Sequence, residues 1–546
     1  MSSPSLRYYS PAPSDQVFDA EVDLAIYGAT MAGLMAGIEA RSRGLNVLIV
    51  NPGSHVGGMT TSGLGWTDFG NPSVVGGLAR DFYSRLGRNR DGRNGMLWTF
   101  EPSAASAVVR EMIAESGLRI AHGFYVDQVF KERAVISQVR STAGSVVRAS
   151  WFIDASYEGD LMARAGVDSA AGREDNAEFG ETYNGFQLRD LNQFELPVDP
   201  YVVPGRPGSG LIPGVHHAAE LPQPGSGDNL VQAYNFRLCM TRRPELAVPF
   251  PQPADYDESR YELLARYFEA GWRMDLCPDG TFMKFDEVGN GKTDTNNGGA
   301  FSSDFIGGSW EFPGASYAER ERIFQEHVRY HQGLLWFLQT SPRVPDSVAQ
   351  AMRNYGLAGD EFTDTGHWPP QLYIRECRRL RGLETVTERH CFGKTGGDFP
   401  AALGAYSMDS HNCQRVVSGG VVRNEGDVQV HLPAPYEIPF RAMVPRPAEC
   451  TNLIVPVCLS ATHIAYGSVR MEPVFMALGQ AAGLAAAVGL RRGMRAQDLG
   501  AAELEASMLA ARMVFRLGQL KQEERRNHNG NPAVPAPGDA ATLHSV

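Results

Sequence analysis

The sequence has few features that would indicate disulfides, a metal centre or export. Its seven cysteines are odd in number and scattered, and no CxxC pair occurs, so neither a disulfide framework nor a zinc site is indicated. Residues 1–20 lack the basic-then-apolar order of a signal peptide. The most apolar stretch, residues 476–490, is short and interrupted by Gln480, so we expect a buried helix and no membrane span. The sequence therefore predicts a cytoplasmic protein without a metal.

Net positive charge is absent as well. The chain has 50 lysines and arginines against 62 aspartates and glutamates, which gives a formal net charge of −12. An acidic chain is poorly suited to nucleic acid or an anionic membrane, and we expect neither as a partner. Glycine is abundant instead. It occupies 59 of 546 positions, which favours tight turns and close backbone approaches around a large ligand.

The two ends of the chain differ from its body. Residues 1–20 are rich in proline and serine, and we expect a flexible N-terminus. Residues 501–526 are amphipathic and end in a charged run, which predicts a C-terminal helix. Residues 527–546 combine turn formers with no periodic apolar pattern, which predicts a disordered tail.

The body of the chain changes character twice. Residues 21–170 and 436–500 contain apolar strands and helices, whereas residues 171–435 are rich in proline, glycine and aromatic residues and follow no simple period. We therefore predict an α/β fold in which a Rossmann-like nucleotide-binding domain is built from both ends of the chain. Residues 171–435 are expected to form an inserted α+β domain that binds the substrate or caps the site, partly shared with the first domain.

A nucleotide-binding pattern opens the first of these regions. An apolar strand at residues 22–27 leads into a glycine turn, a helix at 34–43 and a second strand at 46–50. This βαβ order places a pyrophosphate on a helix N-terminus. The first glycine of the turn allows the tight bend, the last lets the helix pack on the sheet, and a threonine replaces the middle one. The expected contacts are Gly28, Ala29, Thr30, Ala32 and Gly33.

The segments that follow favour FAD over NAD. Asn51, followed by Pro52, ends the second strand, where an acid normally accepts hydrogen bonds from the ribose. A second glycine-rich loop comes next, which suits a longer cofactor. Asp160 follows a strand and a small-residue turn; we expect it near the pyrophosphate, with helix capping as the alternative. The other expected contacts are Gly57, Gly58, Met59, Thr60, Val126, Ala155, Ser156, Ser468 and Met471.

Several motifs together carry a family resemblance. They include YGATMAG, HVGGMTTSGLGWTDFG, FIDASYEGDLMARAGV, YIRECRRLRG, DSHNCQR and SATHIAYGSVRMEPVFMALGQAAG, and they run from about residue 22 to residue 490. With these motifs the chain resembles the FAD-dependent oxidoreductases of the glutathione-reductase-like flavoprotein group. The resemblance implies a two-domain enzyme that binds FAD in an extended conformation and whose substrate is generally unassigned. Asn51 departs from the family pattern.

A flavin enzyme needs a group that takes a proton from the substrate and positive charge beside the reduced ring. Residues 460–473 offer both. His463 is the first candidate for a substrate-facing acid or base, and Arg470 can supply charge or bind a substrate carboxylate. The N-terminus of the next helix adds partial positive charge. This arrangement is similar to the His-plus-Arg stretch that precedes the last helix in the fumarate reductase and L-aspartate oxidase relatives. Tyr466 is a further candidate, with a core position as the alternative.

A second polar cluster lies in the inserted region. Asp409 and His411 form an Asp-x-His pair, which can orient an imidazole as a base. Asp294, Asn296 and Asn297 can bind sugar hydroxyls or a cation, or form a turn-rich loop.

We expect an FAD-dependent dehydrogenase or oxidase that removes hydride from a C–H bond next to oxygen or nitrogen in a polar, sugar-like small molecule. The electron acceptor, oxygen or another, and the oligomeric state stay open. Non-covalent FAD is favoured, although His55 is a candidate for covalent attachment. One alternative is a flavin monooxygenase using NAD(P)H and oxygen, although no second glycine-rich βαβ unit is visible. Another is a non-catalytic binding protein that contains FAD.

Overall fold

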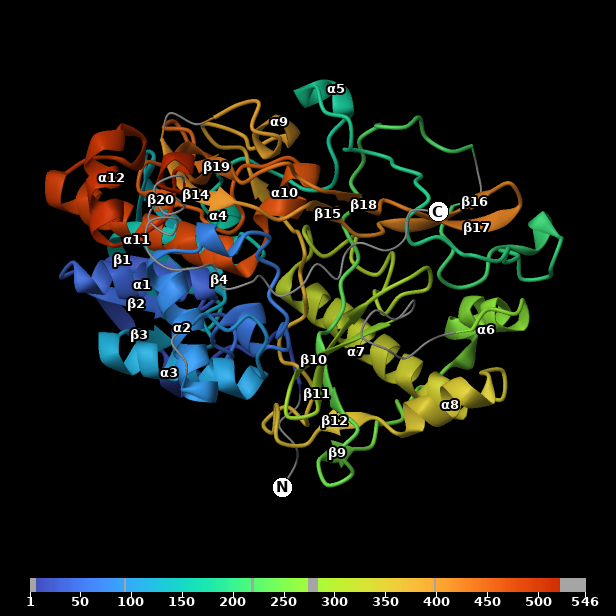
Figure 1. Cartoon of the computed structure of the whole chain (residues 1–546). Coiled ribbons are helices and arrows are strands. Elements are labelled where there is room, and N and C mark those ends of the chain that lie inside the picture. The colour runs from blue at the N-terminus through green and yellow to red at the C-terminus, as the bar shows by residue number, and fades with distance from the viewer. Residues whose placement is uncertain (1–5, 93–94, 218–219, 274–282, 397–398, 521–546) are drawn as a thin grey trace, which may run out of the picture.

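The computed structural model describes residues 6–92, 95–217, 220–273, 283–396 and 399–520. Figure 1 shows two lobes side by side, with both the earliest and the latest elements of the chain in one lobe. That lobe contains a seven-stranded sheet of order β3-β2-β1-β6-β5-β4, with β20 beside β6. Its strands are β1 (Asp19–Tyr27), β2 (Val47–Val50), β3 (Arg119–Ala121), β4 (Val126–Glu132), β5 (Val135–Ser141), β6 (Val146–Asp154) and β20 (Leu453–Ile454).

The strand β6 joins the two ends of the chain. Along one edge it is parallel to β1 over its whole length. Along the other edge it pairs with antiparallel β5 near its start and with parallel β20 near its end. Because β20 lies about 300 residues after β6 in the sequence, the predicted α/β fold built from both ends of the chain is confirmed.

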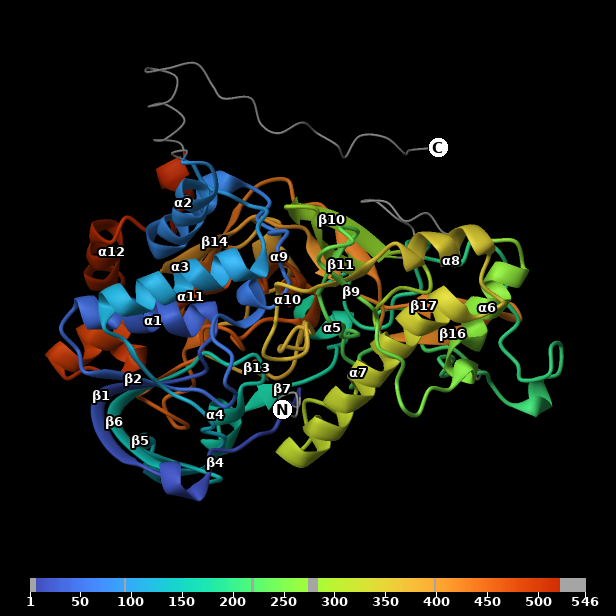
Figure 2. The same cartoon turned by 90° about the horizontal axis from the view of Figure 1, so that it is seen from below.

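Helices cover one face of this sheet, as Figure 2 shows. They are α1 (Met31–Ser42), α2 (Gly77–Asp91), α3 (Pro102–Ser116) and α11 (Glu472–Arg492). The helices α1 and α11 cross with their backbones nearly touching: a Cβ atom added at Gly479 would lie 2.1 Å from the carbonyl oxygen of Ala32, and one at Gly483 would lie 2.3 Å from that of Ala36. Only glycine permits this approach.

The second lobe holds a five-stranded antiparallel sheet of order β10-β11-β8-β12-β9. The long helix α7 begins with a capping box, in which Ser316 and Glu319 exchange hydrogen bonds. The strands are β8 (Leu238–Thr241), β9 (Ala247–Val248), β10 (Met283–Gly289), β11 (Lys292–Asn297) and β12 (Gly356–Ala358), and the helices are α6 (Glu262–Glu269), α7 (Tyr317–Thr340) and α8 (Asp346–Arg353). The short helices α5 (Asn176–Phe179) and α9 (Glu388–Cys391) lie near the top of Figure 1, away from this sheet.

Short strand pairs connect the lobes across the expected domain limits. The strand β7 pairs with β13, and β14 pairs with β19, so segments on either side of residues 170 and 435 share hydrogen bonds. The pair β15–β18 and the hairpin β16–β17 lie between these connections along the chain. The bounds are β7 (Ser169–Ala170), β13 (Arg379–Leu380), β14 (Pro400–Gly404), β15 (Met408–Ser410), β16 (Gln414–Ser418), β17 (Val421–Glu425), β18 (Val428–Val430) and β19 (Tyr436–Pro439).

The described part of the N-terminal segment is packed, in contrast to the flexible segment expected there. The backbone N–H groups of Tyr8 and Tyr9 both donate to the carboxylate of Glu321 on α7, at 2.8 Å each. The Tyr9 ring stacks on Tyr317, with centroids 5.5 Å apart. The stacked rings and the carboxylate of Glu321 therefore fix a segment whose proline and serine content predicted flexibility.

The C-terminal helix is shorter than expected. Instead of running over residues 501–526, α12 spans Ala501–Ala510, and the chain then turns at Arg512, whose φ is +56°. The turn buries Met513 and Phe515, which a continued amphipathic helix would place on different faces. Residues 521–546, including the tail expected to be disordered, lie outside the described residues.

The helix α11 is long and apolar enough to cross a membrane by length and composition alone. However, 89% of its most apolar 18-residue window is buried inside the protein, as in a core helix.

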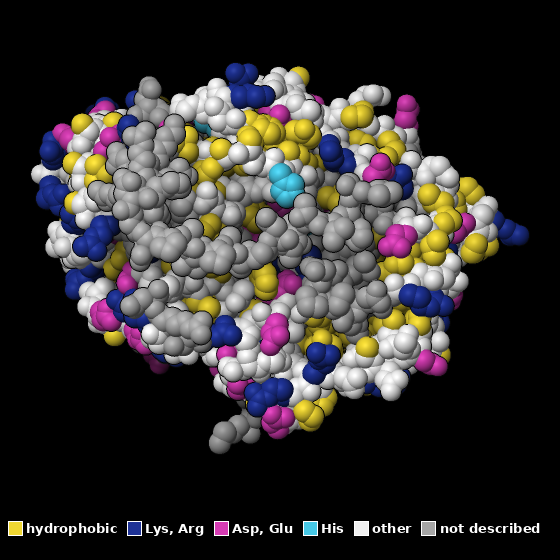
Figure 3. Space-filling model, viewed as in Figure 1, with side chains coloured by type: hydrophobic (Ala, Val, Ile, Leu, Met, Phe, Trp, Pro, Cys, Tyr) yellow, Lys and Arg dark blue, Asp and Glu magenta, His cyan; other side chains and the backbone are white. Residues whose placement is uncertain are grey.

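Lysine and arginine side chains are scattered among acidic and apolar ones on the described surface of the face seen in Figure 3. The cysteines among the described residues are buried and free, and no group of three His, Cys, Asp or Glu residues in the described ranges is placed to hold a metal.

The crossing of α1 and α11 gives a stability prediction. Replacing an interior helical glycine by alanine normally stabilises a helix by about 1 kcal/mol. Gly479→Ala is expected to do the opposite, because the added methyl meets the backbone of α1; overpacking of this kind costs about 1–3 kcal/mol. Urea unfolding measures the change. The control Gly314→Ala, where an added Cβ meets no atom within 4 Å, should unfold like the wild type, and equal behaviour of the two variants would contradict the packing.

Candidate active site

The parallel strands β1, β2 and β6 end at one edge of the sheet, and the glycine turn follows β1 there. Gly28 has φ of +100°, and a Cβ at Gly33 would lie 2.1 Å from the Gly28 carbonyl oxygen. Thr30 caps α1: its hydroxyl accepts from the Gly33 N–H at 3.3 Å and donates to the Ala155 carbonyl at 2.7 Å. Ala29 and Ala32 are small and buried. The first turn of α1 has no acidic side chain, so its N–H groups and positive dipole end suit a pyrophosphate.

The Asn51 side chain binds neighbouring backbone groups. Its Oδ1 accepts from the Ala29 N–H at 2.9 Å, and its Nδ2 donates to the carbonyl groups of Gly53 at 2.7 Å and His55 at 2.8 Å. These bonds tie the glycine turn to the loop that begins at Pro52. The protein thus uses both ends of the Asn51 amide, and the ribose contact of Asn51 stays a prediction.

The second glycine-rich loop lies against the first turn. The Gly57 N–H donates to the Ala29 carbonyl at 2.7 Å, and both Gly57 and Gly58 have positive φ. The Met59 N–H donates to the Tyr157 hydroxyl at 3.0 Å. The structure thus brings together the predicted glycine turn, the second loop and the segment after β6.

Three further residues expected to contact the cofactor also bind protein groups, and their contact with FAD stays a prediction. Asp160 begins the helix α4 (Asp160–Arg164) and forms ion pairs with Arg320 and Arg378, both at 2.8 Å. Burial alone would raise the pKa of Asp160, but the two guanidinium groups hold it below its usual value. The Val126 carbonyl accepts from the Tyr317 hydroxyl at 2.9 Å, and the Ser156 hydroxyl donates to Asp154 at 2.6 Å. Asp160 and Val126 therefore join the two lobes.

A buried carboxyl group marks the start of α11. The Tyr157 and Thr60 hydroxyls each donate to Glu472, at 2.7 Å. Burial raises the pKa of Glu472 to about 7, although these two hydrogen bonds offset part of the effect. Glu472 and Met471 line a narrow crevice that also contains Asp68 and Arg470. The crevice adjoins a larger cavity, with which it shares four lining residues.

The larger cavity has a volume of about 650 Å³ and is lined mainly by polar side chains. It shares Asp68, Tyr373, Arg375 and Arg470 with the crevice. Trp66 is at its rim and is 44% exposed. Other lining residues are Arg237, Lys284, Asp286, Asn296, Asn297, Tyr406, Asp409, His411, Gln429 and His431. Two of the four predicted catalytic residues, His411 and Arg470, therefore face one cavity.

His411 is oriented by a carboxylate that the sequence did not indicate. Its Nδ1 lies 2.9 Å from Asp304 Oδ2, and Asp304 in turn pairs with Arg375 at 2.9 Å. Asp409, the expected partner, lies 3.5 Å from Nε2 on the opposite side of the ring. The imidazole thus lies between two carboxylates, with one edge at the cavity.

Three arginines at the cavity are already paired with acids. Arg470 contacts Asp409 at 3.2 Å, and Arg375 contacts Asp304. The third pair is Arg237 with Asp294, in which Nε donates at 2.7 Å. The centres of the three guanidinium groups lie 4.6–5.8 Å from the centroid of the Tyr373 ring. The cavity therefore presents charged hydrogen-bonding groups whose charges are balanced by immediate neighbours.

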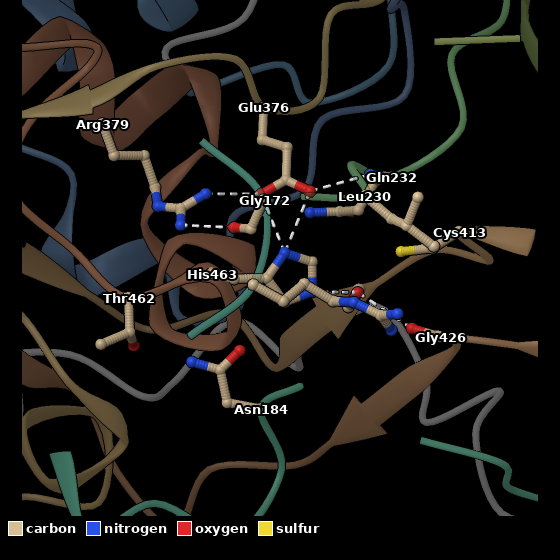
Figure 4. A network of polar contacts seen from close by, with 12 residues as sticks. Gly172, Asn184, Leu230, Gln232, Glu376, Arg379, Cys413, Gly426, Thr462 and His463 are labelled. Atoms are coloured by element: carbon tan, nitrogen blue, oxygen red, sulfur yellow. Dashed lines mark hydrogen bonds and ion pairs between the residues drawn. The ribbon is translucent and has the colours of Figure 1, made fainter. Parts of the chain in front are cut away.

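His463 and Tyr466 do not line this cavity, contrary to expectation. His463 is 2% exposed; its Nδ1 lies 2.9 Å from Glu376 and its Nε2 lies 2.9 Å from the Ser410 hydroxyl. Figure 4 shows His463 pointing at Glu376, with Arg379 bound to the same carboxylate. The Tyr466 hydroxyl donates to the Val457 carbonyl at 3.2 Å. Both side chains are core residues behind the cavity.

Two remaining candidates have positions of their own. The Ser468 hydroxyl donates to the Tyr406 carbonyl at 2.6 Å and so supports the cavity wall. His55 lines a different cavity, of about 640 Å³, and its Nε2 lies 2.8 Å from the hydroxyls of Thr61 and Ser62. Burial lowers the pKa of His55 to about 4. Covalent attachment at His55 stays a prediction.

The residues that sequence reasoning missed are Asp304, Tyr373 and Arg375. The last two belong to the segment YIRECRRLRG. Its many arginines among apolar residues could have indicated buried charges near a site. Asp304 lies in a loop rich in glycine and serine, and its partner is 107 residues away. Only the folded chain brings it to His411.

Comparison with known proteins gives the family. The model of the family described as FAD dependent oxidoreductase matches residues 23–508, and the chain belongs to this family. No curated protein matches the sequence. The fold comparisons include the anhydrotetracycline hydroxylase OxyS from Streptomyces rimosus, at 15% identity and a TM-score of 0.22, covering 32% of this chain and 41% of that one. They also include THI4 from Thermovibrio ammonificans, at 20% identity and a TM-score of 0.23, covering 28% and 67%. The chain thus spans about two fifths of the hydroxylase.

The buried Glu472 gives a pH prediction. Its pKa of about 7 in the folded protein exceeds the value of about 4.3 expected in the unfolded chain. The stability contributed by its bound proton is complete below pH of about 4 and is lost as the pH rises through 7. Glu472→Gln cannot ionise, so we expect the variant to gain stability relative to the wild type between pH 5 and pH 8, on the order of 1–3 kcal/mol.

Urea unfolding at the two pH values measures this difference. Glu111→Gln, at an exposed position of α3, is the matched control and should keep the pH dependence of the wild type. A constant difference between Glu472→Gln and the wild type over this range would show that Glu472 is ionised throughout.

Proposed function

We propose that this FAD-dependent oxidoreductase is a dehydrogenase or oxidase that removes hydride from a C–H bond next to oxygen in a neutral, hydroxylated small molecule such as a sugar. The observation that carries the proposal is the Asp304–His411 pair at the wall of a polar cavity. A histidine held by a carboxylate is the usual arrangement of a general base. The crevice that adjoins the cavity is lined by Met471 and Glu472, at the start of α11.

The charge balance of the cavity favours a neutral substrate. Each of Arg237, Arg375 and Arg470 has its own aspartate partner, so none supplies uncompensated positive charge for a substrate carboxylate. Guanidinium N–H groups and carboxylate oxygens both line the wall. A hydroxyl group both donates and accepts hydrogen bonds, so neighbouring hydroxyls of one molecule can use both kinds of group.

The chain's own residues then have the following roles. His411 takes the proton from the substrate hydroxyl at Nε2 as the neighbouring C–H bond breaks, because Nδ1 is hydrogen-bonded to Asp304 and Asp409 lies 3.5 Å from Nε2. Asp304 and Asp409 then stabilise the positive charge that the ring acquires. Arg470, fixed by Asp409 and the Tyr373 hydroxyl at 2.8 Å, orients the substrate by donating hydrogen bonds from its guanidinium group. FAD, when bound, accepts the hydride. The product is the corresponding carbonyl compound.

The cofactor is proposed to bind non-covalently. The first turn of α1, with Gly28, Thr30 and Gly33, would hold the pyrophosphate, and the loop at Gly57–Thr60 would lie beside it. Three features support this pyrophosphate position: the positive φ at Gly28, the close contact at Gly33 and the absence of acidic side chains in that turn. A cytoplasmic location, and oxygen or another molecule as the electron acceptor, are parts of the same proposal, and no nucleic acid or membrane partner is expected. Self-association stays open.

Two alternatives make different predictions. A flavin monooxygenase would be reduced by NADPH without an organic substrate, and a non-catalytic binding protein would be reduced by neither. Anaerobic mixing with NADPH, D-glucose, D-galactose, glycerol or benzylamine, followed by flavin absorbance, separates these cases. We expect bleaching with a hydroxylated compound. Rapid bleaching by NADPH alone would contradict the proposal and support the monooxygenase.

His411→Asn tests the proposed base. We expect the variant to retain FAD and to be reduced about 10²–10⁴-fold more slowly by the best substrate of that panel, because the proton acceptor is lost. His431→Asn is the matched control, since His431 lines the same cavity but contacts only the Ser407 hydroxyl at 3.0 Å. It should react at close to the wild-type rate. An unchanged rate in His411→Asn would remove His411 from the mechanism.

A further inference from the structure

The cavity at His411 continues into a second one. The second cavity has a volume of about 370 Å³ and shares Lys284, Asn297 and Gln429 with the first. Because these side chains line both, the two cavities are adjacent. We refer to the two together as the groove and to each cavity as a section of it. The groove passes along the edge of the sheet formed by β10 and β11, where Lys284 faces Asn296 in the strand register.

The second section is lined by polar side chains, as the first is, but His411 does not belong to it. Its lining includes amide and acidic side chains from residues 190–195, together with the backbone of residues 298–300. Glu195 and Leu191 belong to this wall, and Leu191 is 42% exposed. The section has no histidine among the described lining residues. It is therefore suited to binding polar groups and not to the proton transfer proposed for His411.

The size of the groove exceeds the needs of a single small polar molecule. Ligand sites commonly have volumes of about 300–1,000 Å³, and each section alone is within that range, at about 650 and 370 Å³. Trp66, 44% exposed at the rim of the first section, offers a large flat apolar surface beside polar groups. Such a ring suits a molecule that has an apolar face and a hydroxylated edge.

We propose that the groove binds a neutral oligosaccharide. The sugar unit to be oxidised occupies the first section beside His411, and at least one further unit of the same chain occupies the second section, against Leu191 and Glu195. This inference rests on the proposed function, since it names the substrate class of that site. The arginines of the first section are paired with aspartates, and the second section contains Asp190 and Glu195 as well as Lys284, which disfavours a polyanionic chain. Asn297 and Gln429 add amide groups that can hydrogen-bond neutral hydroxyls.

Chain length is the direct test. Equilibrium binding by calorimetry and anaerobic flavin reduction are both measured for the FAD-bound protein with glucose, cellobiose, cellotriose, maltose and maltotriose. We expect at least one disaccharide or trisaccharide to bind about tenfold more tightly than glucose, with a gain that appears as a lower KM. Affinities of all four oligosaccharides equal to or below that of glucose would overturn the proposal.

Two variants locate the second section. Leu191→Ala and Glu195→Gln are expected to weaken binding of the preferred oligosaccharide about fivefold, in line with the loss of one contact, and to leave glucose unaffected. Leu509→Ala, an exposed leucine on α12, is the matched control and should change neither ligand. Equal losses for glucose and the oligosaccharide, or no loss for either, would contradict the assignment.

The two proposals fail in different ways. If glucose and the longer chains reduce the flavin equally well, the reaction stands and the extended groove is wrong. If a trisaccharide binds in a manner that depends on Leu191 and Glu195 but reduces no flavin, the groove stands and the proposed reaction is wrong. If no sugar binds or reacts, both are wrong.

Discussion

The crossing of α1 and α11 is the contact on which the site depends. Gly479 and Gly483 bring α11 against the carbonyl groups of Ala32 and Ala36, so the relative position of the two helices is fixed by backbone atoms. The helix α1 begins at the glycine turn, and α11 begins at Glu472, next to the crevice and Arg470. One rigid contact therefore sets the separation between the proposed pyrophosphate position and the cavity, although these elements lie at opposite ends of the sequence.

A second constraint positions the reactive strand. The helix α10 (His463–Val469) packs on β15, which carries Asp409 and leads to His411. A Cβ at Gly467 would lie 2.7 Å from the Asp409 carbonyl oxygen, and His463 holds Ser410 at 2.9 Å. His463 is in turn paired with Glu376. Buried ions are costly unless they are paired and hydrogen-bonded, and here the pairing serves to hold a strand in place. His463 thus acts on the site from behind, as a positioning residue.

Much of the fold was predictable, because it depends on local patterns. The βαβ unit and the glycine turn follow from strand, turn and helix signals within about 30 residues. The joining of both chain ends was predictable because strand and helix signals return in residues 436–500. Pairings between distant side chains were not predictable. His463 and His411 look alike as isolated histidines, and only the fold sends one to Glu376 and the other to Asp304. Asn51 likewise satisfied the motif position, but its amide is used by neighbouring backbone groups.

A crystal structure of the purified protein with its cofactor tests the central claim most directly. The account predicts a yellow protein in which FAD extends from the first turn of α1 to the N-terminus of α11, with its ring exposed to the cavity that holds His411 and Arg470. A colourless protein, or an FAD ring directed into the separate cavity beside His55, would contradict it.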